Sequence, residues 1–289
     1  MCLLELAKQT TGVAGDLTWI SAGGLLRAAM SMGLNHDPEN LVKMTPLRTE
    51  LRRRLWVAIL EINLQASLDA GALPLISPRD FDTRPPRNLD EQDLTAETGQ
   101  DVLSDIGLGS YTQTSAQTAL FESFATRLAI VNLVNQSDPP EYRETLRLSD
   151  DLVSSTRALM QRLRSYPRDE YGVSGISSFQ LHLVEMIMNR HLLALHLPWW
   201  NDALRNPIHY YSRKTSVDAA RTLASLYRTA PNPSPSLIDF DRLLVCGSGP
   251  FRSTPVHACL TLTLEYIHLK EEEQNNKGLT SLLEALNLM

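Results

Sequence analysis

The stretch that decides the fold covers residues 22–90 and falls into three consecutive pieces. They read AGGLLRAAMSMGLNHDP at 22–38, ELRRRLWVAILEINLQASLDAGALPLIS at 50–77 and PRDFDTRPPRNLD at 78–90. In the first two pieces apolar residues recur at steps of three and four, the spacing of one helix face. The third piece is rich in proline, which neither continues a helix nor sits in a central strand. The stretch therefore predicts two helices followed by an extended strap.

The longer of these helices carries a signal at each end. Thr45 is a candidate N-cap, and Pro46 then takes the first helical position, where its missing N–H costs nothing. Gly71 provides a left-handed stop. Between the two ends we expect one buried stripe, formed by Leu47, Leu51, Leu55, Ile59, Ile62 and Ala66.

The shorter helix precedes it in the chain. We expect Asp16 to cap this helix and Gly33 to end it, with a polar loop over 35–44 leading into the longer one. The face expected to be buried consists of Ala22, Leu25, Leu26, Ala29 and Met32. After Gly71, the prolines at 74, 78, 85 and 86 predict a strap across both helices, with Phe81 as its apolar anchor.

Three motifs in this order resemble the middle homology region of fungal transcription factors. They are Met-Gly-Leu-Asn-His-Asp-Pro at 32–38, Glu-Leu-Arg-Arg-Arg-Leu-Trp at 50–56 and Asp-Phe-Asp-Thr-Arg-Pro-Pro-Arg-Asn-Leu-Asp-Glu at 80–91. The resemblance continues in Leu-His-Leu-Pro-Trp-Trp at 195–200 and Tyr-Ser-Arg at 211–213. It implies structural roles for Gly33, Leu34, His36, Arg53, Leu55, Trp56, Asp80, Phe81, Pro85, Pro86, His196 and Pro198.

Members of that family normally carry a six-cysteine binuclear zinc cluster near the N-terminus. This chain of 289 residues has only Cys2, Cys246 and Cys259, with no close pair among them. A disulfide scaffold and a cysteine zinc site are therefore both unsupported. The resemblance implies that zinc, and the reading of DNA, belong to a cluster outside this chain.

The charge balance also argues against DNA binding by the chain itself. It has 27 Lys and Arg residues against 33 Asp and Glu residues, a formal net charge of -6. That is the wrong sign for neutralising DNA phosphates. The arginines at 48, 52, 53 and 54 form one locally basic helix face, which we interpret as solvated or paired within the protein.

The remainder of the chain predicts further helices and no sheet. We expect helices over 115–135, 141–165, 177–197, 211–228, 254–273 and 279–288, because apolar residues keep helical spacing there. Pro198 is expected to end the helix over 177–197, and 230–236 is expected to be a stiff proline-rich connector. Residues 91–114 are polar and glycine-containing, which predicts a long flexible loop. The predicted fold class is an all-α multi-helical array with an extended strap.

Two features remain as candidate sites. Asp80 and Asp82 form an Asp-x-Asp unit that could hold a divalent cation in a metal-assisted enzyme, although a turn-closing role is the simpler interpretation. Trp199 and Trp200 are a candidate ligand or partner surface, although bulky residues after a helix more often fill a core. No stretch approaches eighteen consecutive apolar residues, so we predict no membrane span.

The sequence therefore predicts one helical regulatory domain over residues 1–289, with the signature segment at 14–90, the loop at 91–114 and further helices at 115–289. Because little precedes the first motif, we expect the chain to begin inside the family's domain. The resemblance implies a non-enzymatic, nuclear regulator of transcription, with protein partners or self-association and a small-molecule effector. The alternative is a stand-alone interaction module that modulates a full-length factor. No cofactor is expected in this chain.

Overall fold

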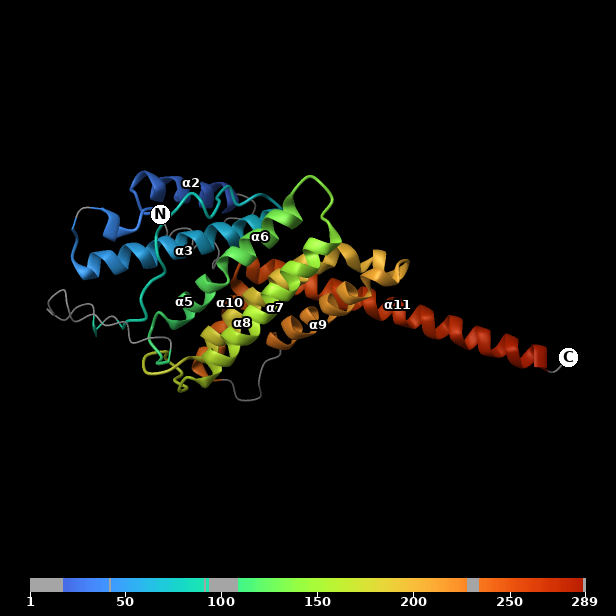
Figure 1. Cartoon of the computed structure of the whole chain (residues 1–289). Coiled ribbons are helices and arrows are strands. Elements are labelled where there is room, and N and C mark those ends of the chain that lie inside the picture. The colour runs from blue at the N-terminus through green and yellow to red at the C-terminus, as the bar shows by residue number, and fades with distance from the viewer. Residues whose placement is uncertain (1–17, 42, 91, 94–108, 228–233, 288–289) are drawn as a thin grey trace.

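The computed structural model describes residues 18–41, 43–90, 92–93, 109–227 and 234–287, with side chains of the last helix described as far as Gln274. Within these ranges the chain is helical and has no strands, only an isolated bridge between Arg168 and Ile176. The α-helices are α2 (Thr18–Ser31), α3 (Pro46–Ala70), α5 (Ser115–Glu122), α6 (Phe124–Asn135), α7 (Tyr142–Ser165), α8 (Ser178–Trp200), α9 (Tyr210–Leu226), α10 (Pro235–Cys246) and α11 (Pro250–Asn287). The predicted all-α class is confirmed (Figure 1).

The pair α2 and α3 forms as the sequence predicts. The Oγ1 of Thr45 accepts a hydrogen bond from the backbone N–H of Arg48, and Pro46 is the first helical residue. At the other end Gly71 has the left-handed φ of 61° that stops α3. Gly33 follows α2 with a φ of 66°, as expected for a residue that turns the chain out of a helix. The expected cap Asp16 lies outside the described residues.

The expected apolar stripe of α3 is wrong in its first half. Leu51 is 51% exposed and Leu55 is 39% exposed, while Glu50, Arg53 and Trp56 are buried in their place. The reason is that the loop after α2 and the strap both cover the polar side of these first turns. Met32, also expected to be buried, is 66% exposed because it lies just beyond the end of α2.

Residues 72–90 form the extended segment that the prolines predict, and we refer to them as the strap. Its apolar anchor is Phe81, whose ring lies edge-on to Trp56 at 5.7 Å and to Phe124 at 6.3 Å between centroids. Thr83 Oγ1 donates to the carbonyl of Leu34 at 2.8 Å, which fixes the strap to the end of α2. The prediction of a strap pinned by Phe81 is confirmed.

The expected loop over 91–114 is only partly described, and its described end is not loose. Thr112 and Thr114 are 0% and 4% exposed, and the Oγ1 of Thr112 donates to Asn88 Oδ1 at 2.6 Å. This end of the loop is therefore packed against the strap. The helix expected over 115–135 is divided at Ser123, whose backbone leaves the helical pattern between α5 and α6.

Pro198 does not end the helix that contains it. α8 continues to Trp200, and Pro198 is an exposed residue of its last turn. Because a proline has no N–H, the carbonyl four residues earlier, that of Ala194, receives no helical hydrogen bond from position 198. At its start α8 has a capping box, in which Ser177 and Gln180 exchange hydrogen bonds.

The C-terminal part differs most from the prediction. Pro235, expected in a connector, is the first residue of the helix α10, where proline's fixed φ is favourable. The two closing helices expected over 254–273 and 279–288 are one helix, α11, which has no break at 274–278. A glycine within a helix costs only about 1 kcal/mol, so the Gly278 signal is too weak to divide it.

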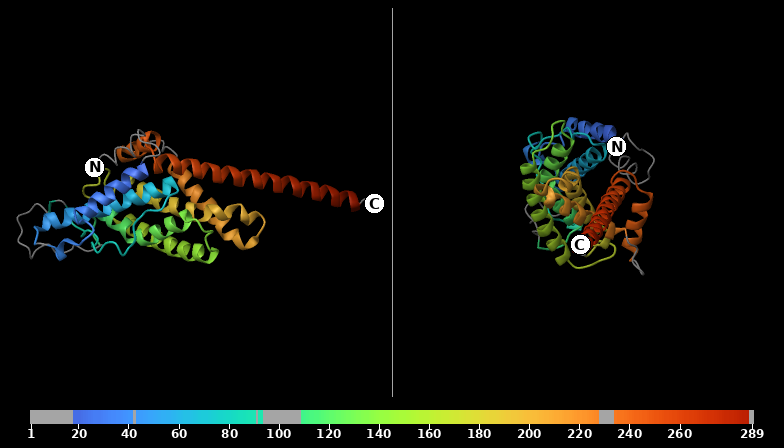
Figure 2. Two further views of the ribbon diagram at one scale, coloured as in Figure 1. Left: turned by 90° about the horizontal axis from the view of Figure 1, so that it is seen from above. Right: turned by 90° about the vertical axis from the view of Figure 1, so that its right-hand side faces the viewer.

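Three apolar clusters hold the described helices together. The first packs α2, α3, the strap and α6, the second packs α5, α6, α7 and α8, and the third packs α8, α9, α10 and the start of α11. α8 contributes to two of the clusters and packs along α9, α7 and α6. Beyond its contacts with α9, α11 projects away from the other helices (Figures 1 and 2).

Candidate functional site

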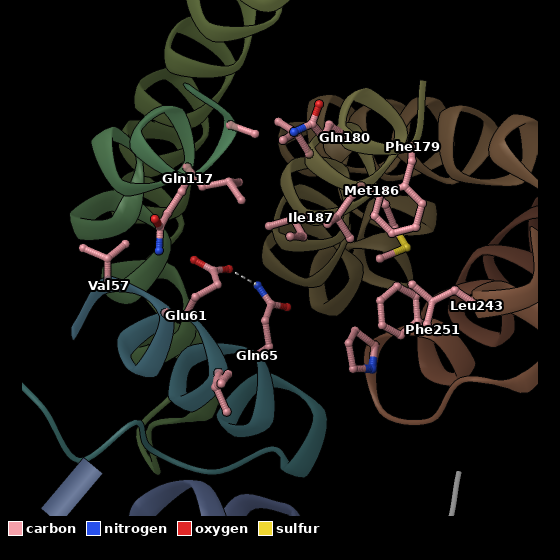
Figure 3. Close-up of a pocket in the computed structure, with 17 residues that line it drawn as sticks. Val57, Glu61, Gln65, Gln117, Phe179, Gln180, Met186, Ile187, Leu243 and Phe251 are labelled. Atoms are coloured by element: carbon pink, nitrogen blue, oxygen red, sulfur yellow. Dashed lines mark hydrogen bonds between the residues drawn. The ribbon is translucent and has the colours of Figure 1, made fainter. Parts of the chain in front are cut away.

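A pocket of about 440 Å³ lies where the three apolar clusters meet (Figure 3). One side is formed by α3 and α5, and the other by α8, α10 and the first residues of α11. Its wall is mostly apolar, and the few polar side chains in it are glutamines and one glutamate. The lining residues are Val57, Ala58, Glu61, Ile62, Gln65, Ala116, Gln117, Leu120, Phe179, Gln180, Leu183, Val184, Met186, Ile187, Leu243, Pro250 and Phe251.

The only charged side chain in this wall, Glu61, is neutralised from behind. Arg127 of α6 is 0% exposed and donates hydrogen bonds to both carboxylate oxygens of Glu61, at 2.7 and 2.8 Å. Such a two-point contact is the strong form of a carboxylate–guanidinium pair. Gln65, one helical turn further along α3, donates to Glu61 Oε1 at 2.7 Å. The pocket therefore presents no unpaired charge on this side.

The polar side chains continue from the pocket towards α11. Arg190 of α8 donates to Gln65 and to Asp69, both on α3, and Asp69 also accepts from Ser253 of α11 at 2.7 Å. Burial lowers the pKa of Arg190, while the neighbouring Asp69 acts to raise it. This line of contacts ties α3, α8 and α11 together beside the pocket.

The turn between α10 and α11 positions the lining residues that these two helices contribute to the pocket. Gly247 leaves no room for a side chain, because a Cβ there would lie 2.4 Å from the carbonyl oxygen of Leu243 and 2.9 Å from Phe251 Cβ. Gly249 has a φ of 57°, and a Cβ there would approach Asp69 Oδ2 to 3.0 Å. The two glycines thus allow Leu243 and Phe251, both lining residues, to lie close together at the pocket.

Most of the predicted signature residues gather elsewhere, at the end of α2. Here a network of ion pairs joins the loop after α2, the helix α3 and the strap, and we call it the strap junction. Its members are Asp37, Glu39, Glu50, Arg53, Arg84 and Arg87. Arg53 is 1% exposed; it donates to Asp37 at 2.8 and 3.0 Å, to Glu39 at 2.9 Å and to Glu50 at 3.2 Å.

The acidic members of the strap junction are also contacted from the strap. The backbone N–H of Arg84 donates to Asp37, and that of Arg87 donates to Glu50. Burial acts to raise the pKa of Asp37, but hydrogen bonds from Arg53 and from the N–H groups of Arg84 and Glu39 outweigh it and lower that pKa to about 2. The basic face is interpreted from the sequence as solvated or paired within the protein, and Arg53 is paired.

Other signature residues lie around this junction. Leu34 and Trp56 are buried, Pro86 is buried and Pro85 is exposed on the strap, and Leu55 faces outward. His36 is exposed and lies 3.4 Å from Asp82. The structure thus brings together residues that are up to about fifty positions apart in the chain.

Asp80 and Asp82 have separate local partners. Asp80 Oδ2 accepts from the backbone N–H of Ser77 and closes a turn, whereas Asp82 accepts from the backbone N–H of Asp37 and from Asn40. Among the described residues no group of three or more His, Cys, Asp or Glu side chains is placed to hold a metal ion. The arrangement fits turn closure, and the metal-assisted alternative gains no observation in its favour.

The signature residue His196 lies at a second polar contact, between α7, α8 and α9. It is 0% exposed, with its ring nitrogens 2.8 Å from the hydroxyls of Ser149 on α7 and Ser212 on α9. Burial lowers the pKa of His196 to about 4. A neutral ring with one donor and one acceptor nitrogen thus joins three helices.

The two tryptophans lie near this contact and not at the pocket. Trp199 is part-buried, lies edge-on to Tyr142 and tilted against His209, and donates to Thr145 Oγ1 at 3.2 Å. Trp200 is 6% exposed and donates to Glu265 of α11. Their role as a ligand or partner surface stays a prediction.

Comparison with known proteins agrees with the resemblance at a coarser level. The transcription factor opdR of Penicillium oxalicum is 33% identical over 282 residues, 96% of this chain and 35% of that protein. The Aspyridones cluster regulator apdR of Emericella nidulans is 32% identical over 91% of this chain and 36% of its own length.

The homologues are fungal transcription factors. One of them, from Macrophomina phaseolina, is the Zn(2)-C6 fungal-type transcription factor mpsB, 28% identical over 70% of this chain and 27% of that protein. The chain spans about a third of the length of the curated relatives it matches. No family model matches it, and no solved structure matches.

In the described residues no helix is both long enough and apolar enough to cross a membrane. The sequence did not predict the pocket. The stripe of α8 that contains Phe179, Leu183, Met186 and Ile187 could be recognised as buried, but nothing in it distinguishes packing against a helix from lining a pocket.

Proposed function

We propose that this chain is the regulatory, middle homology region of a fungal transcription factor that controls RNA polymerase II transcription in the nucleus. It acts by binding and not by catalysis. The observation that carries the proposal is the similarity of nearly the whole chain to about a third of each related transcription factor. In the proposal a zinc cluster outside this chain reads the DNA, because three cysteines cannot supply a six-cysteine site.

The arginines on α3 support the proposal that DNA is read outside this chain. Arg52 donates to the carbonyls of Met32 and Gly33, Arg53 lies within the strap junction, and Arg54 donates to the carbonyl of Leu89. Guanidinium groups that already hold the fold together are poorly available for phosphates. With a net charge of -6, the chain has no evident means of binding DNA strongly.

A reporter assay tests the regulatory role. The chain is placed between a heterologous DNA-binding domain and a strong activation domain, and expression is compared with a fusion that lacks it. We expect the intact chain to reduce expression and Arg53→Met to restore it, because this change breaks the strap junction. Arg48→Met, at an exposed position of the same helix, is the matched control and should behave like the wild type.

Equal expression with and without the chain, at equal protein levels, would contradict the proposal. Repression only when the chain is supplied as a separate protein would instead favour the stand-alone interaction module. DNA binding is tested separately by fluorescence anisotropy of a labelled duplex pool at about 50 mM salt, where electrostatic binding is strong. We expect no saturable binding by the isolated chain.

A further inference from the structure

The pocket between α3, α5, α8, α10 and α11 combines a large apolar wall with hardly any free polar groups. Its volume of about 440 Å³ lies within the range of roughly 300–1,000 Å³ in which small-molecule sites fall. Residues from five helices line it, so an occupant would contact the α3–α5 side and the α10–α11 side at once (Figure 3).

The charges near the pocket limit what can enter it. Both oxygens of Glu61 are taken by Arg127, and Arg190 is directed to Gln65 and Asp69. A charged ligand would lose its hydration without gaining an unpaired partner, which is strongly unfavourable. The body of the ligand should therefore be uncharged and largely apolar.

Two polar atoms of the wall are open among the described residues, Gln180 Nε2, which has no acceptor there, and Gln117 Oε1. Gln117 of α5 donates its Nε2 to the carbonyl of Arg54 at 2.9 Å, which fixes the amide, and its Oε1 has no hydrogen-bond donor among the described residues. This oxygen can accept from a hydroxyl or N–H of a ligand. A peptide segment fits less well, because it would bring many backbone donors and acceptors into a wall with few partners for them.

We propose that this pocket binds an uncharged, mainly apolar small molecule that donates one hydrogen bond to Gln117. As an effector site it rests on the proposed regulatory function, since binding would join α10 and α11 to α3 and α5. The ligand-binding statement itself concerns only the pocket, and it can be tested on the purified chain.

The probes are Nile red, an uncharged fluorophore without a hydrogen-bond donor, and 1-decanol, compared with decanoate at pH 7.5. We expect saturable Nile red fluorescence that 1-decanol displaces, with decanoate at least 10-fold weaker. Ala58→Phe, which places a ring in the pocket from α3, should abolish binding of both Nile red and decanol. Ala125→Phe, at an exposed position of α6 outside the pocket, is the matched control and should bind normally.

Gln117→Met tests the polar contact alone. It should weaken 1-decanol about 5-fold, the effect of one lost hydrogen bond, and leave Nile red unchanged. Circular dichroism and melting curves establish that each variant is folded, and Ala116→Phe fills the pocket from α5 if Ala58→Phe does not fold. Absence of Nile red binding, binding unaffected by both filling variants, or decanoate binding as tight as decanol would overturn the proposal.

The two proposals fail in different ways. If decanol binds in the pocket but the chain has no effect in the reporter assay, the regulatory function is wrong and the ligand site stands. If the reporter is repressed but neither probe binds, the ligand site is wrong and the regulatory function stands.

Discussion

The strap junction and the pocket teach opposite lessons about how this chain is built. The strap junction is polar, with Arg53 buried among Asp37, Glu39 and Glu50, and its members lie in segments whose motifs are recognisable in the sequence. The pocket is apolar and is assembled from five helices that have no motif in common. Specific polar contacts leave a sequence signature, whereas an apolar space is left by the way helices meet.

The difference also concerns energy. Removing one partner from a buried ion network leaves the others without a countercharge in a region that excludes water. Removing a methyl group from the wall of an existing pocket only enlarges a space that is already there. We therefore expect mutations at the strap junction to be costly and mutations at the pocket to be mild.

The largest effect is expected for Arg53→Met. It leaves Asp37, which is 1% exposed, without its arginine and Glu50, which is 2% exposed, with Arg87 at 3.8 Å in place of two arginines. The change should lower the free energy of unfolding by about 3–5 kcal/mol. Arg48→Met, at an exposed position of α3, should change it by less than about 0.5 kcal/mol. Urea denaturation measures both, and a loss under 1 kcal/mol for Arg53→Met would mean that the network contributes little.

A matched pair of leucines compares the two regions directly. Leu34 is 3% exposed and lies beside the strap. Leu34→Ala should lower the free energy of unfolding by about 3 kcal/mol, because a cavity forms in a closed core. Leu183 is half-buried in the pocket wall, and Leu183→Ala should lower the free energy of unfolding by only about 1 kcal/mol. Equal losses in thermal or urea unfolding would indicate that the pocket is as tightly packed as the core.

His196 gives a smaller, pH-dependent test of a polar contact that carries no net charge. Burial lowers its pKa to about 4 from an ordinary value of 6.5, so the folded protein binds the proton less well than the unfolded chain. The stability from this neutral ring is present above pH 6.5 and is lost as the pH falls towards 4.

His196→Gln cannot take up that proton. The stability advantage of the wild type over this variant should therefore shrink by roughly 2 kcal/mol between pH 8 and pH 5. Urea denaturation at the two pH values measures the difference. An advantage that is the same at both pH values would show that folding does not lower the pKa of His196.

Single helices show which features of the fold could be predicted from the sequence and which could not. The ends of α3 were predictable from Thr45, Pro46 and Gly71, since caps act locally. Its buried face was not, because Leu51 and Leu55 point outward while Arg53 is covered by a strap thirty residues further along. The continuation of α8 through Pro198 and of α11 through residues 274–278 shows that weak local breakers do not decide helix length.

By itself the sequence determined the helical class, the caps, the strap and the family resemblance, because periodicity, proline and glycine act over a few residues. It also determined the composition, with its excess of acidic residues and only three cysteines. Only the tertiary structure decided which polar groups neutralise one another and where α3, α5, α8, α10 and α11 leave a space between them. Both depend on contacts between residues up to about two hundred positions apart, and no local pattern encodes such contacts.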